Sequence, residues 1–171
     1  MKHPFVLLAV EQKLFTKGIQ HYGLPYDDPK ITDEDKIRYD ACLIIHKDAK
    51  PIGDIGVKTL SGGKFAVFLY QGSYKFFAEV YNYIFNDWLL NTDYEIRNES
   101  VRERYISHPD RVTEEKLKTE FYIPIKSRST IKMANQSALI YSENIYANEL
   151  LRIGGLKVLR GFDEESINVS S

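Results

Sequence analysis

The sequence carries one pattern twice, as YDDPKITDEDKIRYDACLII at residues 26–45 and as ISHPDRVTEEKLKTEFYIPI at residues 106–125. Both stretches contain, in order, a proline, two acids, a lysine, an aliphatic residue, a base, a further acid and an apolar run. They align without gaps, with Pro29 on Pro109, and this spacing is longer than the repeats of solenoid proteins. The pattern therefore predicts a duplicated supersecondary unit, two copies of which pack into one domain.

The residues around these stretches predict an α+β fold. Alternating apolar residues predict strands at 20–26, 37–45, 64–70, 101–107 and 118–125. Ser73 is a candidate helix N-cap, and an apolar stripe follows it. The stripe comprises Phe77, Tyr81, Ile84, Phe85 and Trp88. The second half thus reads strand, helix, strand, strand, whereas the first half shows only the last two strands. Pro124 predicts an edge position or a bulge for its strand.

The two ends of the chain are less regular. Glu11 to Gly18 is consistent with a short helix or with a loose lead-in. Near the other end, 137–141 resembles a strand and 145–153 a helix. Two interpretations follow: an added tail that ends in a flexible DEESINVSS, or a rearranged chain whose end supplies the strand and helix missing from the first half.

Charge and composition exclude several classes of protein. The formal net charge is −1, so no basic excess is available to hold a nucleic-acid backbone, and direct nucleic-acid binding is disfavoured. The single Cys42 excludes an internal disulfide, fits a reducing compartment and is expected in the core. The apolar run Phe5 to Val10 is too short for a membrane span or a secretion signal. We therefore expect a cytoplasmic protein without membrane contact.

Glu103 is the most informative polar residue. In the strand at 101–107, alternation places Val101, Glu103 and Tyr105 on one face and Arg102 on the other. If the first face is the inner one, a carboxylate is buried, which is unfavourable unless it is paired. The residue is then either a structural ion-pair partner, or solvated after all, or a pocket acid for a cationic or hydrogen-bonding ligand. The twelve tyrosines fit either a β core or an aromatic-lined pocket.

Patterns for other chemistry are missing from the sequence. None of the four histidines has metal-ligand spacing, and the glycines follow neither a phosphate-binding nor a dinucleotide-binding pattern. A serine nucleophile elbow is also absent. We therefore expect no metal, no cofactor and no assignable catalytic residue.

Several motifs resemble the GyrI-like small-molecule-binding domain, which is also the effector-binding module of AraC-type and MerR-type multidrug regulators. They lie between about residues 19 and 126, and they include YDDP at 26–29, DEDKIRYDA at 33–41, GGKFAV at 62–67, ERYI at 103–106 and TEFYIPI at 119–125. The resemblance implies two βαββ units related by a pseudo-twofold axis, an antiparallel sheet with helices on one side, and a ligand cleft between the units. The first unit would lack its first strand and helix. The expected division is a lead-in at 1–18, the domain at 19–126 and an extension at 127–171.

The resemblance also implies roles for particular residues. Glu103 matches a glutamate that contacts ligand in drug-binding members, and Trp88 matches an aromatic helix position beside the cleft. Where the family usually has Pro-Cys-Phe before this glutamate, the chain has Ser100-Val101-Arg102, and Arg102 should point away from the pocket. The expected ligand-binding set is Glu103, Trp88, Tyr105, Tyr81, Phe85 and Tyr39.

Three functions are compatible with this reading. The first is a stand-alone sensor or regulatory protein that binds an amphipathic, cationic or aromatic small molecule. The second is a modulator of a larger protein, as gyrase-inhibitory members are. The third is a hydrolase of reactive ring compounds, in which Glu103 would activate water or a leaving group. A homodimer could restore the wall missing from the first unit.

Overall fold

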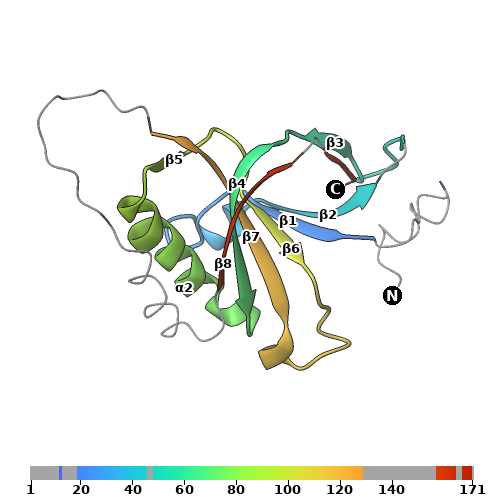
Figure 1. Cartoon of the computed structure of the whole chain (residues 1–171). Helices are drawn as coiled ribbons and strands as arrows, with labels where there is room; N and C mark the ends of the chain where they lie inside the picture. The colour runs from blue at the N-terminus through green and yellow to red at the C-terminus, as the bar shows by residue number, and fades with distance from the viewer. Residues whose placement is uncertain (1–11, 13–18, 46–47, 129–156, 165–166, 171) are drawn as a thin grey trace, which may run out of the picture.

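A computed structural model describes residue 12 and residues 19–45, 48–128, 157–164 and 167–170. Within these ranges the chain forms a nine-stranded antiparallel sheet and one long helical segment (Figure 1). The strands are β1 His21–Pro25, β2 Tyr39–Ile45, β3 Val57–Leu60, β4 Gly63–Gln71, β5 Tyr94–Ile96, β6 Arg102–Tyr105, β7 Lys118–Ser127, β8 Lys157–Glu164 and β9 Ile167–Ser170. The helical segment comprises η2 Tyr74–Phe76, α2 Phe77–Asn82, η3 Tyr83–Trp88 and η4 Leu89–Asn91, and two further 3₁₀ turns are η1 Glu34–Lys36 and η5 Glu114–Lys116. The α+β class is therefore confirmed.

The strand order forces the sheet to bend. The order is β3-β9-β2-β1-β6-β7-β4-β8, with β5 paired to β7 beyond β6. β3 and β4 lie near opposite ends of this order, yet only Ser61 and Gly62 separate them in the chain. Such a link spans about 10 Å, so the sheet curls until its two ends approach each other. Figure 1 shows β3 leading directly into β4.

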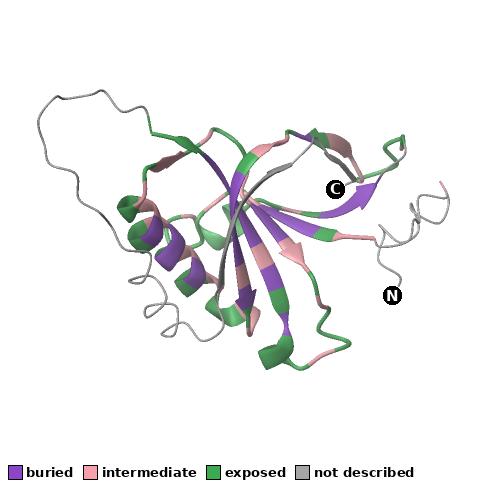
Figure 2. Ribbon diagram, in the orientation of Figure 1, coloured by how far each residue is buried: buried purple, intermediate pink, exposed green. Residues whose placement is uncertain are grey.

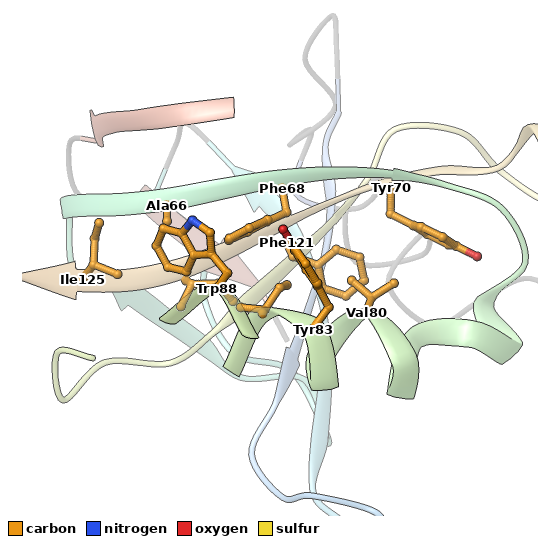
Figure 3. Packing of buried hydrophobic residues seen from close by; sticks show 10 residues of the cluster. Ala66, Phe68, Tyr70, Val80, Tyr83, Trp88, Phe121 and Ile125 are labelled. Carbon is orange, nitrogen blue, oxygen red and sulfur yellow. The ribbon is translucent and has the colours of Figure 1, made fainter. Parts of the chain in front are cut away.

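Apolar side chains are buried on both faces of this sheet. Figure 2 marks the buried residues of its strands in purple. The cluster inside the bend consists of Tyr22, Leu24, Cys42, Ile44, Leu60, Phe65, Val67 and Tyr122. The cluster beneath the helix, shown in Figure 3, consists of Ala66, Phe68, Tyr70, Val80, Tyr83, Ile84, Trp88, Phe121, Ile123 and Ile125. β4 and β7 contribute to both clusters because successive strand residues point to opposite faces.

The two similar stretches form two similar hairpins, β1–β2 and β6–β7, which lie side by side in the sheet. Tyr22 pairs with Cys42 in the first hairpin, and Arg102 pairs with Tyr122 at the equivalent place in the second. η1 and η5 also occupy equivalent places in the two stretches. The repeat is thus present in the hairpins. Two complete βαββ units are not confirmed, because the structure describes a helix for the second unit only, and this finer prediction stays a prediction.

The helical segment begins as predicted but does not keep one stripe. The Ser73 hydroxyl accepts a hydrogen bond from the Lys75 amide at 3.4 Å, which caps the first turn. η3 is a π-helical turn, so the spacing of side chains changes partway along the segment. Val80, Tyr83, Ile84 and Trp88 are buried on the sheet, whereas Phe77, Tyr81 and Phe85 are only partly buried.

The prediction of an edge strand or a bulge at Pro124 was wrong. β7 lies between β6 and β4, and its pairing with β4 runs without a register shift from Lys118 to Pro124. The Pro124 carbonyl accepts a hydrogen bond from the Arg97 amide at 2.9 Å. The nitrogen and the carbonyl of one strand residue face the same side, so the missing N–H of Pro124 lies on the side of Arg97 and not on the side of β4. At that point β7 passes from pairing with β6 to pairing with β5, so the proline interrupts neither ladder.

The flexible end predicted for DEESINVSS is also wrong, because Ile167–Ser170 form β9 inside the sheet. β9 pairs with β2 on the side away from β1, as β4 pairs with β7 on the side away from β6. The predicted elements at 11–18, 137–141 and 145–153 lie outside the described residues, apart from Gln12. In the part of the chain that the structure describes, every helix is too short or too polar for a transmembrane span.

Truncation tests the role of β9. β3 sits at the end of the strand order and pairs with β9 alone among the described strands. Removing residues 165–171 should therefore lower Tm by about 5 °C or more, because β3 loses its ladder. Removing Ser171 alone is the control. Equal Tm values for the two truncations in thermal denaturation by circular dichroism would show that β9 does not support the sheet.

Candidate functional site

A cavity of about 780 Å³ opens on the helix face of the sheet. Its walls come from the helical segment, from β6 and from the loop that joins β1 to β2. The lining residues used below are Tyr26, Asp27, Arg38, Tyr39, Tyr74, Phe77, Tyr81, Phe85, Glu103 and Tyr105. The volume falls in the range of sites that enclose a drug-sized molecule, and aromatic rings dominate this lining.

Glu103 is the second residue of β6 and is only 4% exposed. Its Oε1 accepts a hydrogen bond from the Tyr81 hydroxyl at 2.6 Å, and its Oε2 accepts one from Tyr105 at 2.5 Å. Tyr39 Oη lies 3.3 Å from the same Oε2 and 2.7 Å from Tyr105 Oη. We refer to Tyr39, Tyr81, Glu103 and Tyr105 as the tyrosine–glutamate cluster.

The carboxylate of Glu103 has hydroxyl partners but no cation. Among the described residues, no lysine, arginine or histidine forms an ion pair with it. The geometry therefore contradicts two of the interpretations drawn from the sequence, namely the structural ion pair and the solvated face. A buried negative charge held by neutral donors retains a strong attraction for a cation that enters the cavity.

The pKa values of the surrounding tyrosines reflect this charge. Burial, and after it the Glu103 charge, raises the pKa of Tyr39, Tyr74, Tyr81 and Tyr105 above the ordinary value. The hydroxyls therefore stay protonated at neutral pH and act as hydrogen-bond donors. Burial likewise raises the pKa of Cys42 to about 11, so its thiol is a poor nucleophile.

Aromatic rings pack around the cluster. Tyr81 and Phe85 stack with centroids 6.0 Å apart and planes 8° from parallel. Phe77 stacks on Tyr105 at 6.5 Å, and Tyr74 meets Tyr105 edge to face at 5.4 Å. Ring faces carry partial negative charge, so the wall adds cation–π attraction to the charge of Glu103.

The structure brings five of the six expected ligand-binding residues to the cavity and places Trp88 elsewhere. Trp88 is 9% exposed and packs edge to face on Phe68 at 5.0 Å, in the core beneath the helix (Figure 3). It supports the helix that carries Tyr81 and Phe85. Arg102 points away from the cavity, as expected, and lies over the Phe65 ring at 4.4 Å on the other face.

Sequence reasoning missed the polar residues of the β1–β2 loop that line the cavity, and the contacts that hold this loop. Asp27 accepts hydrogen bonds from the Arg38 backbone amide at 2.8 Å, from Nε at 2.9 Å and from Nη2 at 2.8 Å, and this holds the two ends of the loop together. Tyr26 donates to Asp40 at 2.7 Å, and Lys58 contacts both residues. The repeat contained a sequence signal at Asp27, because its counterpart at position 107 is also a small polar residue, Ser107. In the structure the Ser107 hydroxyl accepts a hydrogen bond from the Lys118 amide at 2.7 Å, as Asp27 accepts one from the Arg38 amide.

The described residues contain no group of three His, Cys, Asp or Glu side chains that could hold a metal ion. Chemically, the cavity offers one carboxylate, several hydroxyl donors and a large aromatic surface. This combination suits binding of an organic molecule.

Comparison with known proteins agrees with this geometry. The family profile described as "GyrI-like small molecule binding domain" matches residues 6–126. The chain belongs to the GyrI-like family. This membership places the cavity in a domain whose family description is small-molecule binding.

Relatives and a solved structure extend the comparison. The chain is 35% identical over 85 residues to the SPbeta prophage-derived putative transcriptional regulator YosT of Bacillus subtilis strain 168, covering 50% of this chain and 56% of YosT. It is 29% identical over 110 residues to the probable transcriptional regulator YgiV of Escherichia coli K12, covering 62% of this chain and 67% of YgiV. This GyrI-like chain thus matches little more than half the length of YosT and about two thirds of YgiV.

A chain from the structure titled "Cryo-EM structure of EcmrR-DNA complex in EcmrR-RPo" superposes with a TM-score of 0.61 at 18% identity. The superposition covers 73% of this chain and 47% of that one. At this identity the likeness concerns the fold alone.

Replacing Glu103 by Gln tests the electrostatics of the GyrI-like cavity. The change removes a negative charge that opposes phenolate formation, so the pKa of Tyr74 should fall, although burial, the larger cause, keeps it raised. Titration followed by NMR of ¹³Cζ-labelled tyrosine measures this. Glu120→Gln is the control, because the Glu120 carboxylate accepts from Tyr122 instead. An unchanged Tyr74 midpoint in Glu103→Gln would contradict the assigned charge.

The Asp27–Arg38 pair gives a prediction at acid pH. Hydrogen bonds from Arg38 lower the pKa of Asp27 to about 2. Because the pKa of Asp27 is lower in the folded state, the ion pair stabilises the fold at pH values above the ordinary pKa of 3.8. This stabilisation is lost as the pH falls towards about 2. In Arg38→Met the Asp27 pKa should rise towards 3.8, which ¹³Cγ NMR of Asp27 would detect. Lys36→Met, in the same loop, should leave it unchanged, because Lys36 pairs with Asp33 instead.

Proposed function

We propose that this chain binds an organic cation with aromatic or amphipathic character in the cavity beside Glu103. The observation that carries the proposal is a buried carboxylate with hydroxyl partners and no cationic partner among the described residues, surrounded by aromatic rings. Bringing two opposite charges to about 4 Å at an effective dielectric of 20 is worth about 4 kcal/mol before desolvation. A lipophilic cation loses little hydration on entry, so it retains much of this gain.

The proposed contacts follow the geometry of the cavity. The cation lies against the faces of Tyr39, Tyr81 and Phe85, within the field of Glu103. Tyr74 and Phe77 extend the apolar wall, and Tyr105 orients the carboxylate. Trp88 acts indirectly, by holding the helix against the sheet.

The proposal also includes a regulatory role for this chain. YosT and YgiV are named as transcriptional regulators, and the chain matches only part of each. We infer that the chain works as a sensor that passes ligand occupancy to a partner, and that it does not contact DNA itself, because its net charge is −1. We propose the division 1–18, 19–126 and 127–171, in which the last segment contributes β8 and β9 to the sheet of the domain. Homodimerisation is a proposed way to complete the cavity wall.

The hairpin repeat supports an evolutionary proposal. The two hairpins correspond over strands, turns and register, and Gly23 pairs with Glu103, its own counterpart in the repeat. This is the pairing expected beside a pseudo-twofold axis. We infer two related units, with β9 occupying in the first unit the place that β4 occupies in the second.

Two other functions have weaker support. A modulator of a larger protein would use a solvated acidic surface, whereas Glu103 is buried. A hydrolase would need a free acid or base, yet both Glu103 oxygens accept hydrogen bonds, and no histidine is among the described residues that line the cavity. Cation binding, by contrast, leaves the hydrogen bonds from Tyr81 and Tyr105 to Glu103 in place.

Isothermal titration calorimetry with tetraphenylphosphonium and tetraphenylborate tests the proposal, because these ions share size and shape and differ in the sign of their charge. We expect the cation to bind and the anion not to bind. Glu103→Gln should weaken cation binding by about ten- to a hundredfold, the equivalent of about 1.4–2.8 kcal/mol. Glu120→Gln, on the other sheet face, is the matched control. Equal affinity for the two ions, or an unaffected Glu103→Gln variant, would refute cation recognition.

A further inference from the structure

Five tyrosines line the cavity, and the hydroxyl protons of four of them are already used within the protein. Tyr81 and Tyr105 donate to Glu103 at 2.6 and 2.5 Å. Because the Tyr105 proton is used in this way, Tyr39 is the donor in the 2.7 Å contact between the hydroxyls of Tyr39 and Tyr105. Tyr26 donates to a carboxylate of β2 at 2.7 Å. A ligand that enters the cavity finds none of these four protons free.

Tyr74 is the fifth tyrosine and the exception. It is half-buried, and its hydroxyl forms no hydrogen bond within the part of the chain that the structure describes. Burial, and after it the charge of Glu103, raises the pKa of Tyr74, although no hydrogen bond joins the two side chains. The hydroxyl is therefore protonated at neutral pH and lies in the field of Glu103, yet it stands outside the tyrosine–glutamate cluster.

Neighbouring groups fix the ring of Tyr74. Its centroid lies 5.2 Å from that of Phe77 and 5.4 Å from that of Tyr105, which it meets edge to face. Ser73, the preceding residue, donates a hydrogen bond to Glu114 of the second hairpin at 2.8 Å. The oxygen of Tyr74 is thus held in place while its proton can still turn, so hydrogen bonding to a ligand requires little further ordering of the protein.

The other polar side chains of the lining do not share this combination of burial and an uncommitted hydrogen-bonding group. Asp27 accepts three hydrogen bonds from Arg38. Exposed side chains, which water can reach, make up the rest: Asp28, Lys30, Asn82 and Asn86. Among the described polar side chains that are buried or half-buried in the cavity wall, Tyr74 is therefore the one that makes no hydrogen bond to the protein.

We propose that Tyr74 is a ligand-binding residue that selects, among organic cations, those that also carry a hydrogen-bond acceptor such as a carbonyl oxygen. This inference rests on the proposed function. The cationic group lies beside Glu103, and the Tyr74 hydroxyl donates to the acceptor of the same molecule. N–H donors of a ligand form stronger, charge-assisted bonds with the Glu103 carboxylate, which leaves the neutral hydroxyl for an acceptor.

The test compares (4-acetylbenzyl)trimethylammonium with (4-isopropylbenzyl)trimethylammonium, two cations of similar shape of which only the first has a carbonyl oxygen. The 3-substituted pair is measured as well, so that the position of the acceptor varies. In isothermal titration calorimetry, Tyr74→Phe removes the hydroxyl and keeps the ring. It should shift the acetyl-to-isopropyl affinity ratio of at least one pair about three- to tenfold towards the isopropyl compound, because one net hydrogen bond is lost.

Tyr122→Phe is the matched control, because the Tyr122 hydroxyl donates to Glu120 instead and the residue packs in the cluster inside the bend. It should leave both ratios unchanged. In wild type, the ¹³Cζ resonance of Tyr74 should also move further with the acetyl cation than with the isopropyl cation. Ratios that Tyr74→Phe leaves unchanged, or that Tyr122→Phe shifts equally, would overturn the role of Tyr74.

A neutral pair separates this role from the proposed function. The compounds 4-acetylbenzyl alcohol and 4-isopropylbenzyl alcohol keep the ring and its substituent and lack the charge. If Tyr74→Phe shifts their ratio while Glu103→Gln changes the affinity of no ammonium, cation recognition fails and acceptor recognition by Tyr74 holds. If the ammonium ions bind in a Glu103-dependent way and no ratio depends on Tyr74, the reverse is true. If none of these compounds binds, both proposals fail.

Discussion

The Glu103 carboxylate accepts hydrogen bonds from tyrosines on three separate segments: Tyr39 on β2, Tyr81 on the helix and Tyr105 on β6. The arrangement of the cavity depends on this contact. A charge at this depth is tolerated only while its hydrogen bonds are made, so the three segments must meet at one place. The same constraint leaves the charge without a counter-ion among the described residues, and it is this unmatched charge that makes the cavity suited to a cation.

The bend of the sheet is what brings those segments together. The two-residue link between β3 and β4 closes the ends of the strand order, and the inner face fills with apolar side chains such as Phe65 and Tyr122. With that face filled, the opposite face of β6 and β7 must be covered by the helix. The cavity forms where the helix stops covering the sheet, beside the loop between β1 and β2.

Much of the second half was predictable from sequence because its signals are local. Alternation located β4, β6 and β7, and the N-cap at Ser73 located the start of the helix. Five of the six expected ligand-binding residues line the cavity, since period-two alternation and helical spacing fix which way a side chain points. The helix stripe was misassigned in part, because a π-helical turn shifts the spacing and turns Trp88 into the core while Tyr81 and Phe85 face the cavity.

The sequence by itself determined the two hairpins, their shared pattern and the carboxylate at position 103, because each depends on neighbours close in the chain. Only the tertiary structure decided that β9 enters the sheet, that Pro124 lies in an inner strand, and that Gly23 leaves room for Tyr39. These features join residues far apart in sequence. Their energies arise from which strands become neighbours and from the space left between side chains, and no local pattern records either quantity.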